Sequence, residues 1–489
     1  MAQKPSIPKG TRDFGPAEVQ KRKYILTTIE TVFKKYGFMP IETPTMENLS
    51  TLEGKYGDEG DKLLFRVLNS GNPFDELIEE DNERFNLKQL NSHLPNIEIS
   101  VPEDGKRSRL LKSILRKTTE KGLRYDLTVP FARYVVMNRN EITFPFKRYQ
   151  MQPVWRADRP QKGRYREFWQ CDADVVGSDS LLNELDLIQM YDEAFRKLGI
   201  EKYELRMNNR KVLAGIAEVV KSVDAMSSIA VAIDKLDKIG EEGVRKELSE
   251  QGFKSDELNR LFDIITIKGE NKIILNQLKS KLQSSTEGLK GIEELEFIFN
   301  GIEQITQATD NTINITADFS LARGLSYYTG CIFEVVSSEG TLTSSIGGGG
   351  RYDNLTGIFG LPNVSGVGIS FGLDRIYDVM DELKLFPEGL NATSTKVLVC
   401  AFDEPTLQTG ISITKQLRDA GIASELYPEL PKSNKEKEKP MLKPMNYADA
   451  LQIPYTLILK SDGSLVLKNM IEKTETTLSI TDIIHHLTK

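Results

Sequence analysis

Apolar residues recur at helical spacing near the start of the chain and predict a helix over residues 16–37. Its stripe contains Ile25, Ile29, Val32, Phe33 and Tyr36, and Gly37 supplies a stop signal. The short segment 38–44 is partly apolar and ends at Pro44, which favours an edge strand. Strand-like segments dominate residues 122–177, and helical spacing returns over residues 181–198. These patterns predict a sheet covered by helices.

The remaining patterns predict further domains. Residues 66–121 are polar with little periodicity and are typical of an inserted, mostly solvated region, to which we assign no function. Residues 210–308 carry helical patterns without strand alternation, and strands return near Asn314. A β-α-β pattern spans residues 396–427, and the charged run 432–439 is typical of a solvated loop. We therefore expect a main domain over residues 1–209 and 313–390, a helical insertion over 210–312 and an α/β domain over 391–489.

Composition narrows the possible functions. With 489 residues, 39% hydrophobic and 28% charged, the chain is typical of a soluble protein of two to four domains. A net charge of -7 argues against indiscriminate nucleic-acid binding, so a nucleic-acid site must be a local basic patch and DNA is not an expected partner. No segment has the apolar length of a signal peptide core or a membrane span, so we expect no membrane partner.

Cysteine and histidine usage narrows the possible functions further. The chain has three cysteines, an odd and widely spaced set that suits a reducing cytosol and neither a disulfide framework nor a cysteine zinc cluster. Its three histidines, His93, His485 and His486, form no metal-ligand pattern and leave the middle of the chain without a histidine base. We therefore expect a cytoplasmic protein with no protein-bound metal centre.

The most informative stretch, residues 148–177, is predicted to be an antiparallel hairpin. Period-two geometry puts Phe168, Gln170, Asp172 and Asp174 on one face of its second strand, and apolar residues on the other. A solvent-facing sheet would give the same alternation with about equal probability. The loop shifts that balance, because it holds five cations beside this acidic face: Arg156, Arg159, Lys162, Arg164 and Arg166. Such cations require an anionic partner, and ATP beside the ammonium group of an amino acid satisfies both signs.

Three later stretches add candidate chemistry. Residues 322–330 contain Arg323 and a Tyr-Tyr pair and lead into an apolar strand over 331–336. Four consecutive glycines at 347–350 precede Arg351 and Tyr352; taken alone, they are typical of a flexible hairpin tip. Residues 366–375 are predicted to be a small-residue strand that enters a helix, which is a weak signal by itself.

Together and in this order, these stretches resemble a class II aminoacyl-tRNA synthetase, specifically the histidyl-tRNA synthetase family. The segment from Lys9 to Pro44 resembles the family's start and motif 1, residues 148–177 motif 2 and residues 366–375 motif 3. The stretches at 322–330 and 347–353 resemble the two histidine-specific motifs. The resemblance implies an α+β fold: a class II antiparallel sheet flanked by helices, a helical insertion over the acceptor stem and a C-terminal α/β anticodon-binding domain. It also implies a homodimer paired through motif 1.

The resemblance further implies ATP-dependent ligation of L-histidine to tRNA(His) through a histidyl-adenylate, with Mg2+ on the ATP phosphates. Arg156 and Arg323 would be catalytic, and the ATP site would comprise Arg156, Asp158, Arg164, Phe168 and Arg375. The histidine site would comprise Asp126, Thr128, Gln170, Asp174, Arg323, Tyr328 and Tyr352. Gln161 and Arg166 would meet the acceptor end of the tRNA, and Lys443, Tyr447 and Lys468 the anticodon.

The chain departs from the family pattern at several positions, and the resemblance itself leaves one main alternative open. Ser326 stands where the family usually has Asp, and Asp126, Asp158 and Asp174 stand where many members have Glu. A catalytically silent regulator that senses histidine or tRNA would share the same architecture. Such regulators typically lose catalytic arginines or the C-terminal domain, whereas Arg156, Arg323 and Arg375 are present here. The enzyme is therefore the favoured hypothesis.

Overall fold

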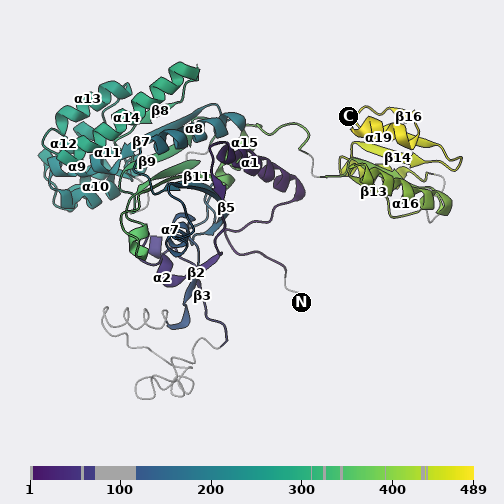
Figure 1. The fold of residues 1–489 in the computed structure, drawn as a ribbon, viewed down its shortest axis with the longest axis horizontal. Helices are drawn as coiled ribbons and strands as arrows, with labels where there is room; N and C mark the ends of the chain where they lie inside the picture. Colours follow the sequence, from purple (N-terminus) through teal and green to yellow (C-terminus); the bar gives the residue numbers. More distant parts are fainter. Residues whose placement is uncertain are drawn as a thin grey trace, which may run out of the picture. The chain divides into compact units, whose positions relative to one another are not determined.

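The computed structural model describes residues 4–56, 60–71, 117–309, 311–322, 327–341, 345–390, 393–430, 436 and 439–488. The chain divides into two compact units (Figure 1). The larger unit comprises Met1–Arg12 and Tyr24–Leu385, and the smaller one Asp13–Lys23 and Phe386–Lys489. None of the helices in these described stretches is long and apolar enough to cross a bilayer.

An eight-stranded sheet organises the larger unit, in the order β1-β5-β6-β11-β10-β9-β7-β8. Its strands are β1 Met39–Pro40, β5 Phe146–Trp155, β6 Glu167–Val176, β7 Tyr203–Asn209, β8 Ile315–Ala317, β9 Cys331–Ser337, β10 Gly347–Tyr352 and β11 Gly366–Gly372. The six central strands pair antiparallel, which confirms the predicted sheet. The two edge strands pair parallel, β1 with β5 and β8 with β7, and helices lie in the connection between the two strands of each pair.

The first helix and the helix after the hairpin cover one face of this sheet (Figure 1). They are α1 Pro16–Lys35 and α8 Leu182–Lys197, close to the predicted bounds. The ring of Phe33 on α1 lies 5.5 Å from Tyr149 and 5.8 Å from Phe371, and that of Tyr191 on α8 lies 4.7 Å from Phe371. This aromatic core fixes β5 and β11, which flank β6. The helix α15 Leu373–Glu382 follows β11 directly, as predicted for residues 366–375.

The opposite face carries an unpredicted helix, α7 Thr128–Met137, within the stretch whose pattern indicated strands. Its sequence is rich in β-branched and aromatic residues, so its composition favours a strand. Pro130 is tolerated because it lies in the first turn, where no helical hydrogen bond is lost. The apolar side of α7 is buried against Phe146, Val176 and Tyr352, and this tertiary packing overrides the local preference.

Smaller elements surround α7. The three-stranded sheet β2-β4-β3 comprises β2 Met46–Asn48, β3 Arg66–Val67 and β4 Lys121–Leu123, beside the short helix α2 Leu49–Leu52. The strand expected over residues 38–44 is shorter, covering only Met39–Pro40. Only the two ends of the predicted 66–121 insertion belong to the described chain, and residues 72–116 lie outside it. The 3₁₀ turn η2 Thr356–Phe359 also packs on α7.

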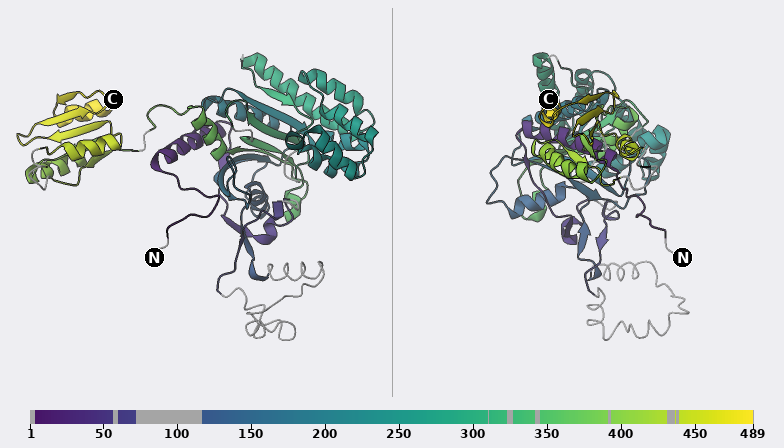
Figure 2. Two further views of the ribbon diagram at one scale, coloured as in Figure 1. Left: turned by 180° about the vertical axis from the view of Figure 1, so that it is seen from behind. Right: turned by 90° about the vertical axis from the view of Figure 1, so that its right-hand side faces the viewer.

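The helical pattern after β7 forms a layer of helices (Figure 2). These are α9 Arg210–Val220, η1 Val223–Ala225, α10 Met226–Ile233, α11 Leu236–Glu250, α12 Ser255–Ile265, α13 Asn271–Lys281 and α14 Thr286–Thr309. Gly215 on α9 and Gly288 on α14 face each other so closely that a Cβ on either would contact the other's backbone. The boundaries that we predict for a separate domain at 210 and 312 stay a prediction.

The smaller unit contains the predicted β-α-β pattern. It starts with β12 Val397–Cys400, α16 Glu404–Asp419 and β13 Ser424–Leu426, and continues with α18 Leu442–Ala450, β14 Tyr455–Leu459, β15 Leu465–Asn469, β16 Glu475–Thr477 and α19 Ile480–Thr488. The sheet order is β13-β12-β14-β15-β16. Apolar residues of α16 and α19 are buried on one side of it and Ala448 of α18 on the other. Most of the charged run 432–439 lies outside the described residues.

Candidate active site

Two hollows that share part of their walls lie on the sheet face opposite α1 and α8. The outer cleft has a volume of about 420 Å³ and the inner pocket one of about 40 Å³. Their shared wall includes Arg156, Gln170, Tyr328 and Ser370. Strand β6 runs along both, because Phe168 and Gln170 line the outer cleft while Gln170, Asp172 and Asp174 line the inner pocket. The alternation predicted for β6 is therefore confirmed.

The acidic face of β6 does not face solvent. Asp172 and Asp174 are each 2% exposed, while Cys171, Ala173 and Val175 are fully buried on the other face of the strand. The alternative of an ordinary solvent-facing sheet is therefore wrong. Buried carboxylates are costly unless paired, so their presence here indicates a binding site.

Cations line the outer cleft. Arg156, at the end of β5, donates from Nε to the carbonyl of Tyr125 at 3.1 Å, and its guanidinium lies 4.3 Å from the Tyr125 ring and 5.2 Å from the Phe168 ring. Arg375, on α15, donates to the carbonyls of Gly163 and Ser345 at 2.9 and 2.6 Å. Burial lowers the pKa of Arg375, and the nearby Arg156 and Arg164 lower it further. This cluster of like charges suits a polyanion.

Asp158, which is predicted to bind ATP, is also in the cleft. Asp158 lines it, and its carboxylate lies 3.7 Å from Nη1 of Arg164. Arg164 is half-exposed, whereas Arg156 and Arg375 are better covered. All five residues predicted to bind ATP, namely Arg156, Asp158, Arg164, Phe168 and Arg375, therefore line the same cleft.

Asp126 closes one end of the inner pocket, directly before α7. Its Oδ1 accepts hydrogen bonds from the Tyr56 hydroxyl and the Val129 amide, and its Oδ2 accepts one from the Tyr327 hydroxyl, each at 3.1 Å. Burial raises the pKa of Asp126, while these hydrogen bonds and the charge of Arg156 oppose that rise. Thr128, the first residue of α7, lines the same pocket.

Asp174 lies toward the other end. Its Oδ1 accepts a hydrogen bond from the Tyr352 hydroxyl at 2.5 Å, and its Oδ2 forms an ion pair with Nη2 of Arg148 at 2.7 Å. Arg148 is fully buried on β5, with its guanidinium 4.2 Å from the Phe131 ring. Burial raises the pKa of Asp174, and Arg148 opposes that rise. The ion pair with Arg148 therefore offsets part of the cost of burying this carboxylate.

Glycines make room for these side chains. A Cβ on Gly368 would collide with the carboxylate of Asp174, and one on Gly366 with the ring of Tyr352. A Cβ on Gly350 would approach the Tyr328 ring to 2.8 Å. The expectation of a flexible hairpin tip at residues 347–350 is wrong, because these glycines form the interior strand β10 between β9 and β11. Gly350 makes room for Tyr328 and Gly347 for Tyr191, while a Cβ on Gly349 would collide with the backbone of Gly368.

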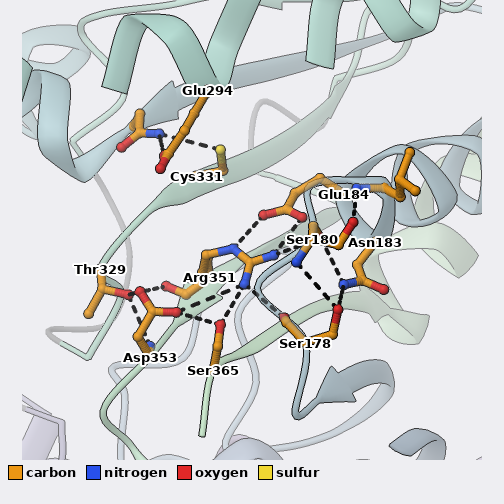
Figure 3. Close-up of polar contacts among 12 residues, drawn as sticks. Ser178, Ser180, Asn183, Glu184, Glu294, Thr329, Cys331, Arg351, Asp353 and Ser365 are labelled. Atoms are coloured by element: carbon orange, nitrogen blue, oxygen red, sulfur yellow. Dashed lines mark hydrogen bonds and ion pairs between the residues drawn. The ribbon is translucent and has the colours of Figure 1, made fainter. Parts of the chain in front are cut away.

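A buried polar network joins the two stretches that resemble histidine-specific motifs, through Thr329, Arg351 and Asp353 (Figure 3). Arg351 makes a two-point ion pair with Glu184 of α8 and donates to the Ser365 hydroxyl at 2.6 Å. Ser365 in turn donates to Asp353 at 2.6 Å, and the Thr329 hydroxyl donates to the other oxygen of Asp353 at 2.6 Å. Because Thr329 follows Tyr328, and Arg351 precedes Tyr352, the network fixes the backbone next to both site tyrosines.

Other predicted site residues lie outside this constellation. Arg323 and Ser326 fall outside the described residues. Gln161 is exposed in the hairpin loop, while Arg166 donates to the carbonyl of Asp158 at 3.0 Å. The three predicted anticodon contacts belong to the smaller unit and have acidic neighbours. Lys443 pairs with Glu436, Tyr447 donates to Glu425, and Lys468 pairs with Glu475.

Several residues that line or support the site were not predicted from the sequence. Tyr125, Ser370 and Glu334 line the outer cleft, and Asp172 and Tyr327 line the inner pocket. Arg148 supports the carboxylates from β5. Asp172 had a detectable signal, since it shares a strand face with Gln170 and Asp174. Arg148 had none, because a lone arginine in a strand is usually exposed at its tip.

The comparisons with known proteins agree with this geometry. The fold and its two-part site define a class II aminoacyl-tRNA synthetase. A family model described as Histidyl-tRNA synthetase matches residues 101–376. The histidine–tRNA ligase of Cytophaga hutchinsonii is 51% identical over 489 residues, covering 99% of this chain and 100% of that protein. That of Porphyromonas gingivalis is 52% identical over 473 residues, covering 96% of each. The chain belongs to the histidyl-tRNA synthetase family, so it is an enzyme, and ATP is a substrate of the reaction.

Solved structures show the same fold. Histidyl-tRNA synthetase from Nostoc sp. PCC 7120 matches with a TM-score of 0.75 and 28% identity, covering 100% of this chain and 99% of that one. A protein described as an ATP phosphoribosyltransferase regulatory subunit/histidyl-tRNA synthetase, from Bacillus halodurans C, matches with a TM-score of 0.65 and 17% identity, covering 90% and 96%. The latter likeness concerns the fold alone. Identity near 50% to ligases over the full length does not favour the regulator.

Proposed function

We propose that the outer cleft binds ATP and the inner pocket binds L-histidine, so that the amino acid's carboxylate meets the α-phosphate where the two hollows share a wall. The observation that supports this most directly is the placement along β6, which passes from the arginine-lined cleft to the carboxylate-lined pocket. Cations thus surround the triphosphate, and acids surround the nitrogens of the amino acid. Arg156 lies at the junction of both hollows and is the proposed α-phosphate ligand.

In the nucleotide site, Phe168 stacks on adenine and Asp158 accepts from its amino group. Arg164 and Arg375 hold the outer phosphates. Among the described residues, no group of three or more His, Cys, Asp or Glu side chains is placed to hold a metal ion. Mg2+ belongs to the nucleotide in this proposal, as part of the MgATP substrate, where it offsets phosphate charge.

In the histidine site, Asp126, Thr128 and Gln170 receive the α-ammonium group. Asp174, Tyr328 and Tyr352 surround the imidazole ring, and Arg323 contacts the carboxylate together with the α-phosphate. Because buried polar groups would be left unpaired by an analogue that lacks the ring nitrogens, such a site can reject it by roughly 10⁴ to 10⁵. The protein then has no need of editing.

The reaction proceeds in two transfers. The histidine carboxylate, already ionised, attacks the α-phosphorus; the bond to the bridging oxygen breaks and diphosphate leaves with that electron pair. Arg156 and Arg323 stabilise the charge that develops on the pentacoordinate phosphorus. The terminal ribose hydroxyl of tRNA(His) then attacks the carbonyl of the histidyl-adenylate, its proton is released, and AMP leaves. This aminoacylation belongs to protein biosynthesis.

The remaining proposals concern assembly and tRNA contacts. We propose a cytoplasmic homodimer that pairs through the segment leading to Pro44. Gln161 and Arg166 contact the acceptor end, and Lys443, Tyr447 and Lys468 contact the anticodon. The acidic partners of Lys443 and Lys468 must be displaced by tRNA, whose phosphates compete for these two cations, and Tyr447 must give up its hydrogen bond to Glu425.

Amino-acid-dependent exchange of pyrophosphate into ATP, measured across all twenty amino acids, tests the function. Exchange that depends on histidine alone is the expected result. Absence of exchange with histidine, while histidine or tRNA still binds, would instead support the silent regulator. A sedimentation measurement tests the dimer separately, and a monomer that retains full activity would contradict it.

A further inference from the structure

The inner pocket holds one carboxylate to which no role has been given, that of Asp172. It is 2% exposed and lies on β6 between Gln170 and Asp174, on the same strand face. It lines the inner pocket together with them. A carboxylate this deeply buried needs a partner, because burying an unpaired charge is strongly unfavourable.

The described residues leave acceptors in this pocket unfilled. Among them, Oδ1 of Asp172, Oδ2 of Asp174 and Oε1 of Gln170 are buried and have no hydrogen-bond partner. Asp126 and Asp174 still differ from Asp172, since both oxygens of Asp126 accept hydrogen bonds, and the two oxygens of Asp174 meet the Tyr352 hydroxyl and, as an ion pair, Arg148. Asp172 is thus the pocket carboxylate with a buried oxygen that neither a hydrogen bond nor an ion pair engages. A ligand N–H is the group that this oxygen lacks.

The charges around the pocket also favour a ligand with N–H donors. Three carboxylates, Asp126, Asp172 and Asp174, face the two buried or half-buried cations Arg148 and Arg156. One negative charge is left over when all are ionised. A ligand that brings positive charge or strong N–H donors relieves this imbalance.

We propose that Asp172 is a further histidine-specificity residue, which accepts a hydrogen bond from a ring N–H of the substrate imidazole. The inference rests on the proposed function. The ammonium group has three N–H donors, and Asp126, Thr128 and Gln170 are three acceptors already proposed for it. The free oxygen of Asp172 is therefore left for the ring, beside Asp174. Two carboxylates on one strand face then accept from the two N–H groups of the imidazolium form of the substrate, in which each ring nitrogen is a donor.

The first test compares Asp172→Asn with wild type in histidine-dependent pyrophosphate exchange. Asn is similar in size but has lost the charge and one acceptor. Loss of a hydrogen bond between the ring and a charged group predicts a KM for histidine raised roughly 10- to 100-fold, with the KM for ATP changed less than about twofold. Asp186→Asn is the matched control, because Asp186 is a half-exposed carboxylate on α8 that pairs with Lys147 and lines neither hollow. It should change neither constant.

The second test separates the ring from the ammonium group. Imidazole-4-lactate keeps the ring but has a hydroxyl in place of the ammonium, so it serves as a competitive inhibitor against histidine. If Asp172 binds the ring, Asp172→Asn weakens this inhibitor by the same factor as histidine. Equal inhibition of wild type and variant overturns the ring assignment, and an unchanged KM for histidine overturns any substrate contact.

Failure of the proposed function gives a different result, because wild type itself would then show no histidine-dependent exchange. Loss of folding in the variant is checked by thermal unfolding without ligand, where Asp172→Asn should be at least as stable as wild type. A variant that unfolds below the wild-type temperature and loses affinity for ATP and histidine alike would show a structural role and overturn the proposal.

Discussion

Arg351 and Glu184 form a two-point ion pair that ties β10 to α8 across the sheet. Nε of Arg351 lies 2.6 Å from Oε1 of Glu184, and Nη2 lies 2.7 Å from Oε2; the two side chains are 5% and 0% exposed. Burial raises the pKa of Glu184, while the hydrogen bonds and the charge of Arg351 oppose that rise. Because Tyr352 follows Arg351 on the strand, the pair also sets where the Tyr352 hydroxyl meets Asp174.

Replacing only one partner of this ion pair should destabilise the protein strongly. Glu184→Gln or Arg351→Met leaves an uncompensated buried group, so we expect the free energy of unfolding to fall by about 3–5 kcal/mol, measured by urea unfolding. The double variant Glu184→Met/Arg351→Met should recover part of the loss, since neither partner is then left unpaired. Lys415→Met, which breaks an exposed ion pair with Asp419, is the control and should change little. If the losses of unfolding free energy of the two single variants simply added in the double variant, Glu184 and Arg351 would not be coupled.

The pH dependence of the protein's unfolding temperature should report the titration of the buried Asp172. Its surroundings include Arg148 on β5, Asp174 beside it on β6, Asp126 before α7, Tyr191 on α8 and Ser370 on β11. Burial raises the pKa of Asp172 to about 7, although Arg148 opposes this, and Asp174 adds to the rise.

A carboxyl with a raised folded-state pKa contributes stability below its unfolded pKa and loses that contribution as the pH rises through the folded value. Without histidine, wild type should therefore lose stability relative to Asp172→Asn between about pH 4 and pH 7. Unfolding temperatures of the two proteins at half-unit pH steps measure this difference. Parallel curves over the range would show that Asp172 does not titrate there.

Gly368 should be indispensable for the inner pocket. A Cβ at this position would collide with the Asp174 carboxylate, which is itself fixed by Tyr352 and Arg148 and cannot retreat freely. Gly368→Ala should raise the KM for histidine at least about tenfold, as expected for displacing a hydrogen-bonded charged group. Gly357→Ala is the control, because there a Cβ meets only ordinary contacts with Pro362 at 3.5 Å. An unaffected KM in Gly368→Ala would show that Asp174 can move without cost.

Local periodicity was enough to predict the acidic face of β6, because a strand places alternate residues on one side whatever surrounds it. It could not predict α7, whose β-branched sequence favours a strand until Phe146, Val176 and Tyr352 bury its apolar side. Nor could it explain the glycines of β10, since their reason lies in side chains that arrive from other segments. Arg148 was missed for the same cause, as its partner Asp174 is 26 residues away and becomes adjacent only through pairing of β5 with β6.

Arg323 should affect chemistry more than binding. It is proposed to stabilise the charge developing on the α-phosphorus, so Arg323→Ala should lower the rate of adenylate formation by about 10² to 10³, the range for loss of one preorganised donor. Single-turnover quench measurements with saturating ATP and histidine check this directly. An unchanged rate of pyrophosphate exchange would reject the role.

Arg375 should instead govern nucleotide affinity. Its guanidinium is oriented by the carbonyls of Gly163 and Ser345 and lies among other cations that lower its pKa, so a bound triphosphate relieves repulsion that the empty cleft must bear. Arg375→Ala should therefore raise the KM for ATP roughly 10- to 100-fold, because a charge-assisted phosphate contact is lost, while the KM for histidine stays nearly constant. Removing this positive charge also lessens repulsion around Arg156, so the variant without ATP should unfold at no lower temperature than wild type. Arg139→Ala, at an exposed position after α7, is the control for loss of a cation. If the KM for ATP did not change, Arg375 would be a support for the hairpin loop through Gly163 rather than a phosphate ligand.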